Sequence, residues 1–134
     1  INPVSDLAAG LPGTGAVLLS DCAQSAGKLP LPEADMVVIS AHKFGGPIGI
    51  GALLVRDFAL LHPVGGHERG YRQGTENLPG AMGMAAALEA TIAGGWGPQD
   101  AFAGLVEAMR ERGGTIIQPG PHSAGYIAAV AHPT

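Results

Sequence analysis

One short segment sets the strongest constraint on what this chain can fold into, because an apolar run there ends in a cluster of polar side chains. The run Met36–Ile39 contains no polar residue, and Ser40, His42 and Lys43 follow it almost directly. An uninterrupted apolar run rich in branched side chains predicts a strand buried on both faces, as in parallel sheets. Ligands bind at the carboxyl ends of such strands. The sequence therefore predicts an α/β fold with a ligand site here.

Lys43 is the most reactive group at this strand end. The chain has only two lysines, Lys28 and Lys43, so Lys43 is not one of many surface charges. A lysine withdrawn from water has a lowered pKa and becomes a nucleophile or a Schiff-base former. The alternative interpretation is a surface lysine in a glycine-containing turn, where lysines are usually found.

A second strand end adds complementary groups. The run Ala16–Leu19 predicts a short strand that leads into Asp21, and Gln24 follows three residues later. With Ser40 and His42, the two ends offer a carboxylate, an amide, a hydroxyl and an imidazole beside the lysine amine. A pyridoxal phosphate enzyme needs such a set to hold the aldehyde, the ring nitrogen and the phosphate. Alternatively, Asp21 only caps a turn, and Ser40 and His42 only satisfy loop backbone groups.

The remaining elements follow from periodicity and turn residues. The connection between the first two strands is too short for a full crossover helix, so these strands are either not neighbours or joined irregularly. We expect a nearly uncharged helix from Pro79 to Ile92, buried on most sides, and an amphipathic helix from Pro98 to Arg112 that ends at Gly113. Three further strands are expected, at Ile48–Val55, Thr115–Gln118 and Tyr126–Val130.

Composition excludes several classes of partner. Charged residues make up 13% of the chain and the net charge is −4, so no nucleic acid is expected. No apolar stretch reaches the roughly twenty residues of a membrane span, so no membrane partner is expected. The single cysteine, Cys22, excludes an internal disulfide and agrees with a cytoplasmic protein. The five histidines lack paired ligand spacing, so we expect no metal site. The low charge, with ends at Ile1 and Thr134, favours a segment of a larger protein over a small apolar protein.

Three segments resemble the cysteine desulfurases, which belong to the class V aminotransferase family of pyridoxal phosphate enzymes. They are Asp21–Lys28, Ser40–Gly51 and Gly65–Asn77, and the resemblance runs from about Asn2 to Ala90. It implies a chain truncated at both ends. Residues 1–93 would form part of the cofactor-binding large domain of a fold-type I transferase, with a mainly parallel central sheet and flanking helices. Residues 94–134 would form a helix and the start of the C-terminal small domain.

The resemblance also implies roles for individual residues. Lys43 would hold the cofactor aldehyde as a Schiff base and later move the α-proton of the substrate. Asp21 would pair with the ring nitrogen, and Gln24 would bond the phenolic oxygen of the ring. Ser40 and His42 would bind the phosphate.

Thr75 would reach the phosphate of a neighbouring subunit, which implies a homodimer. The alternative interpretation of Thr75 is the N-cap of the following helix. The substrate would be L-cysteine, converted to L-alanine with a persulfide left for iron–sulfur cluster assembly or thiolation. A sulfur-acceptor or scaffold protein would then be a further partner.

Two parts of the family machinery are missing from the chain. The sulfur-accepting cysteine and the arginine that grips the substrate carboxylate lie further downstream in the family, and Cys22 does not match that cysteine. We therefore expect the isolated chain to be inactive. Three other interpretations stay open: a selenocysteine lyase, a small-molecule aminotransferase, or a non-catalytic fragment of such an enzyme.

Overall fold

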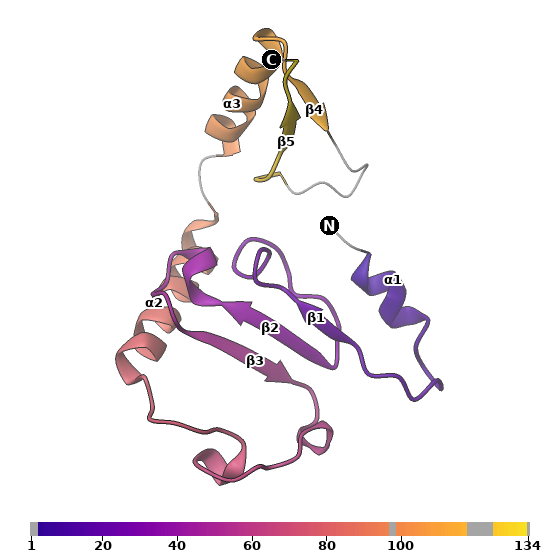
Figure 1. The fold of residues 1–134 in the computed structure, drawn as a ribbon, viewed down its shortest axis with the longest axis vertical. Coiled ribbons are helices and arrows are strands. Elements are labelled where there is room, and N and C mark those ends of the chain that lie inside the picture. Colours follow the sequence, from indigo (N-terminus) through magenta and orange to yellow (C-terminus); the bar gives the residue numbers. More distant parts are fainter. Residues whose placement is uncertain (1–2, 97–98, 118–124, 134) are drawn as a thin grey trace. The chain divides into compact units, whose positions relative to one another are not determined.

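The computed structural model describes residues 3–96, 99–117 and 125–133. The chain divides into two compact units, residues 4–95 and residues 96–134, the second grouped with residues 1–3. Among the described residues, the first unit contains α1 (Val4–Ala9), β1 (Leu19–Asp21), β2 (Met36–Ser40), the 3-10 turn η1 (Ala41–Phe44), β3 (Gly51–Val55), the 3-10 turns η2 (Phe58–Leu60) and η3 (Glu68–Gly70), and α2 (Leu78–Gly94). The second contains α3 (Gln99–Glu111), β4 (Thr115–Ile117) and β5 (Ala129–Ala131) (Figure 1).

The first unit is built on a three-stranded sheet in the order β1-β2-β3. β1 runs parallel to β2, with Asp21 opposite Val38, and β3 runs antiparallel to β2, with Gly51 opposite Ser40. Because β1 and β2 are parallel neighbours, their carboxyl ends lie at the same edge of the sheet. Sequence left open whether these strands were neighbours, and the structure joins them by an irregular connection of turns.

That connection replaces a crossover helix with short hydrogen-bonded turns. The Ala26 N–H donates to Cys22 O at 2.8 Å, and the Leu29 N–H donates to Ser25 O at 2.9 Å. At the amino ends of β1 and β2, the Leu18 N–H donates to Asp35 Oδ2 at 2.8 Å. The two bonds within the connection satisfy backbone groups that a crossover helix would otherwise satisfy.

β2 is buried mainly on one face. Val37 and Ile39 are 6% and 7% exposed and belong to the small core, whereas Met36 and Val38 are half-buried. The expectation of a strand buried on both faces is therefore wrong for the described part of the chain. The rest of this core consists of Cys22, Ala26, Ala41 and Phe44.

α2 begins with a side-chain cap. Asn77 Oδ1 accepts a hydrogen bond from the Gly80 N–H at 3.0 Å, so Asn77 is the N-cap. The alternative that Thr75 caps this helix is wrong, because the helix begins two residues later than that interpretation requires.

α2 packs against η1 along part of its length (Figure 1). Only Gly80 and Thr91 are buried in it, while Met82 and Ile92 are 65% and 74% exposed. We expected this helix to be buried on most sides, and that expectation is not met among the described residues. α2 is apolar on every face, but only one of its faces has a neighbour in the described part of the chain.

The second unit pairs α3 with a small antiparallel sheet of β4 and β5. Gly113 has φ of 86°, and its N–H donates to Arg110 O at 2.9 Å, which ends the helix as predicted. The strand predicted at Thr115–Gln118 is confirmed as β4, and Gln118 lies outside the described residues. The strand predicted at Tyr126–Val130 is only partly confirmed, because β5 begins at Ala129. No helix in the described ranges has the length and apolar character to cross a membrane.

Candidate functional site

The carboxyl end of β1 presents Asp21 at the surface. Its Oδ1 accepts a hydrogen bond from the Ala23 N–H at 2.9 Å, a local turn that holds the carboxylate at the strand end. Next to it, the Cys22 N–H donates to Val38 O at 2.9 Å and extends the pairing with β2. The turn engages Oδ1, one of the two oxygens of this carboxylate.

The 3-10 geometry of η1 determines where His42 and Lys43 project. A 3-10 helix has three residues per turn, so the first and fourth residues lie on the same side. Ala41 and Phe44 are 0% and 2% exposed and both face the core. His42 and Lys43 therefore lie on the other sides of the turn, His42 exposed and Lys43 half-buried. His42 Nδ1 lies 3.1 Å from Ser40 Oγ, which links the strand end to the turn.

Two glycines close the turn that carries the lysine. Gly45 adopts φ of 89°, a left-handed conformation that glycine tolerates best. The Gly46 N–H donates to Ala41 O at 2.8 Å, and a Cβ at this position would lie 2.9 Å from Ala41 Cβ. Any side chain at position 46 would therefore force the turn apart.

Lys28 is a neighbour of the site that the sequence did not single out. Burial lowers the pKa of its amine below the ordinary lysine value, and the positive charge of Lys43 lowers it further. The two amines therefore lie close enough to interact electrostatically. The signal available in the sequence was the position of Lys28 within the segment that also holds Asp21 and Gln24.

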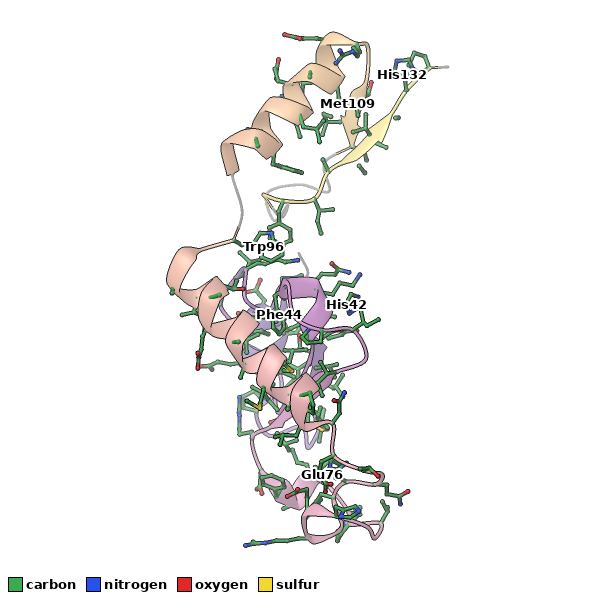
Figure 2. The ribbon with its side chains drawn as sticks, turned by 90° about the vertical axis from the view of Figure 1, so that its left-hand side faces the viewer. His42, Phe44, Glu76, Trp96, Met109 and His132 are labelled. Carbon is green, nitrogen blue, oxygen red and sulfur yellow. The ribbon has the colours of Figure 1, made fainter. Side chains whose placement is uncertain are left out.

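The structure brings some predicted site residues to one place and not others. Asp21, Ser40, His42 and Lys43 lie at the same sheet edge, and Gln24 is exposed on the connection that follows β1. Thr75 is exposed beside Glu76, which lies well away from His42 in the same unit (Figure 2).

Around Thr75, the side chains of Arg72 and His67 both contact Glu76. Glu76 Oε1 lies 2.7 Å from Arg72 Nη2 and 3.4 Å from His67 Nδ1. Arg72 and Glu76 thus form a salt bridge within this loop. Glu68 and Arg69 both have positive φ, 52° and 58°, so this loop contains two non-glycine residues in the left-handed region.

Solved structures identify the fold. A NifS-like protein aligns over 99% of this chain with a TM-score of 0.85 and 32% identity, and the chain covers 40% of it. DndA from Streptomyces lividans aligns over 93% of the chain with a TM-score of 0.77 and 34% identity, again with 40% of that protein covered. The described elements are thus an α/β fragment of the fold-type I architecture.

Comparison with related sequences identifies the family within this fold. The family described as aminotransferase class V matches residues 1–97. A cysteine desulfurase of Rhodobacter capsulatus is 44% identical over 98 residues, which is 68% of this chain and 26% of the relative. A cysteine desulfurase IscS of Anaeromyxobacter dehalogenans is 40% identical over 121 residues, which is 84% of this chain and 29% of the relative.

The chain belongs to the class V aminotransferase family. Enzymes of this family generally depend on pyridoxal phosphate. The chain spans between a quarter and a third of the length of the curated relatives above. The donor set at the sheet edge fits such a cofactor, because it combines a carboxylate, a hydroxyl–imidazole pair and a lysine amine on adjacent elements.

Proposed function

We propose that this chain is the lysine-bearing part of a pyridoxal phosphate-dependent cysteine desulfurase. The enzyme would convert L-cysteine to L-alanine and leave a persulfide for iron–sulfur cluster assembly or thiolation. One observation carries the proposal: Asp21 and the Ser40–His42–Lys43 group lie at the carboxyl ends of adjacent parallel strands. The names of the Rhodobacter and Anaeromyxobacter relatives support the choice of desulfurase within the family.

Each polar group at this edge has a chemical task in the proposal. The cofactor supplies a protonated ring that withdraws electrons from the substrate. Asp21 would keep the proton on the ring nitrogen, and Gln24 would bond the phenolic oxygen. Ser40 and His42 would hold the phosphate. Lys43 Nζ would bind the aldehyde and move a proton to and from the substrate Cα.

The position of Thr75 supports a homodimer. Because Glu76, which follows Thr75, lies away from His42 within one chain, a phosphate contact from Thr75 would be made to a second subunit (Figure 2). A sulfur acceptor or scaffold protein would be a further partner, and we expect a cytoplasmic location. Residues 1–93 would belong to the large domain and residues 94–134 to the small domain.

A second candidate is a non-catalytic fragment of a class V enzyme. The observation that favours it is the burial of the only cysteine: Cys22 is 3% exposed, and its Sγ lies 3.4 Å from Ser20 Oγ. A thiol in that position cannot accept sulfur from a substrate at the sheet edge. Selenocysteine lyase and aminotransferase activity are the alternatives within the enzyme class.

The test is to locate the cofactor on the chain. Pyridoxal phosphate is added, the visible absorbance is recorded, and the complex is reduced with borohydride and digested for mass spectrometry. We expect the reduced adduct on Lys43 and its loss in Lys43→Ala, with Lys28→Ala as the matched lysine control. An adduct that maps to Lys28 would refute the site.

A further inference from the structure

We propose that Thr91 is a positioning residue for the lysine turn, and that it acts through the backbone of Phe44. This inference rests on the proposed function, in which Lys43 holds the cofactor. Thr91 lies on α2, 47 positions after Phe44 in the chain, and it is 8% exposed. The position of Thr91 on α2 does not by itself account for its contact with η1.

The hydroxyl of Thr91 connects α2 to the backbone of Phe44, the residue after Lys43. Thr91 Oγ1 lies 2.7 Å from Ala87 O and 3.2 Å from Phe44 O. A helical threonine commonly donates to the carbonyl four residues earlier, which accounts for Ala87. The second acceptor is non-local, and its carbonyl belongs to the residue directly after Lys43. The shared proton therefore satisfies a buried carbonyl of the lysine turn.

The methyl group of Thr91 completes a three-way contact. At Gly27, which has φ of 75°, a Cβ would lie 3.1 Å from Thr91 Cγ2 and 3.1 Å from Phe44 Cβ. α2 also approaches the segment just after the turn, because a Cβ at Gly83 would lie 2.6 Å from Pro47 Cγ. The connection after β1, the lysine turn and α2 thus meet where Gly27 lies against Phe44 and Thr91.

This contact explains how the amine can be held without a rigid side chain. Lysine has a flexible stem, so the position of its amine depends on the position of the turn that carries it. The core holds the turn through Ala41 and Phe44, and Thr91 holds its C-terminal end. Loss of the hydroxyl would remove this donor to the Phe44 carbonyl and loosen this end of the turn.

The experiment compares Thr91→Val, which removes the hydroxyl and keeps the shape, with Thr91→Ser, which keeps the hydroxyl. Thr14→Val is the control, because it removes a hydroxyl that donates to Leu11 O at 2.7 Å on the surface. Amide hydrogen exchange is measured without cofactor at Gly46, whose N–H closes the turn, and in β2 and β3. Visible absorbance against pyridoxal phosphate concentration and pH is then measured for each chain.

We expect Thr91→Val to speed exchange at Gly46 by about fivefold relative to the strands, as loss of one net hydrogen bond predicts. The cofactor concentration that half-saturates the absorbance should rise by about the same factor. Thr91→Ser and Thr14→Val should stay within about twofold of the unaltered chain. If Thr91→Val does not fold, the result for Thr91→Ser is decisive. Exchange at Gly46 as slow as in the unaltered chain supports the proposal, and exchange about fivefold faster overturns it.

Equal exchange at Gly46 in Thr91→Val and the unaltered chain would refute the positioning role. Exchange that rises equally in the strands would refute it as well, because the effect would then be one of global stability. The failure of the proposed function gives a different result: the unaltered chain would form no adduct at Lys43, while the exchange comparison would still be decisive.

Discussion

Substitution of Gly27 by alanine tests the packing around the lysine turn most directly. Gly27 has φ of 75°, where an L-residue costs about 1–2 kcal/mol in conformational energy. The added Cβ would also lie 3.1 Å from both Phe44 Cβ and Thr91 Cγ2, and those residues are buried, so they have little room to move. Overpacking of this kind costs about 1–3 kcal/mol. We therefore expect Gly27→Ala to lower the free energy of unfolding by about 2–5 kcal/mol.

The matched control is Gly13→Ala. Gly13 has φ of 80°, but no atom lies within 4 Å of the position its Cβ would take. This substitution carries only the conformational cost of about 1–2 kcal/mol. The assay is urea unfolding followed by circular dichroism, with stability taken from the midpoint and slope. If Gly27→Ala destabilises the chain no more than Gly13→Ala does, the reasoning about the three-way contact is refuted.

Further predictions concern the helix cap, the two lysines and the cysteine. Asn77→Ala should cost about 1 kcal/mol in urea unfolding, because it removes the cap on the Gly80 N–H, whereas Asn77→Asp should keep the cap and cost little. Lys43→Met should raise the pKa of Lys28 toward its ordinary value without fully restoring it, because burial remains; NMR titration of the Lys28 side chain measures this, and an unchanged pKa would contradict it. Since the unfolded chain binds the Lys28 proton more tightly than the folded chain, the contribution of Lys28 to stability should increase as the pH rises from its lowered pKa toward the ordinary lysine value. The isolated chain with pyridoxal phosphate should release no sulfide from L-cysteine beyond the rate of free cofactor, because its only thiol, Cys22, is buried; measurable excess sulfide would show otherwise.

Local signals in the sequence predicted much of the fold. The apolar run after Asp35 predicted β2 to within one residue, and the glycine after Arg112 marked the end of α3. Polar groups placed directly after apolar runs indicated the sheet edge where Asp21, Ser40 and His42 lie. Each of these features depends on neighbours within a few residues, which is why sequence reasoning could find them.

Features that depend on distant parts of the chain were predicted less well. Whether β1 and β2 are neighbours is determined by backbone pairing across an irregular connection, which no local pattern specifies. The exposure of α2 depends on which of its apolar faces has a neighbour. The N-cap is Asn77 rather than Thr75, because several nearby polar residues can cap and the geometry selects one.

The sequence by itself determined which chemical groups follow the strands and which family the chain resembles. Tertiary structure alone decided that the Phe44 carbonyl accepts a hydrogen bond from the hydroxyl of Thr91, 47 positions away. It also decided that the charge of Lys43 lowers the pKa of Lys28. The physical reason is that burial and hydrogen bonding between distant segments depend on packing, and packing brings together residues whose separation in the chain carries no periodic signal.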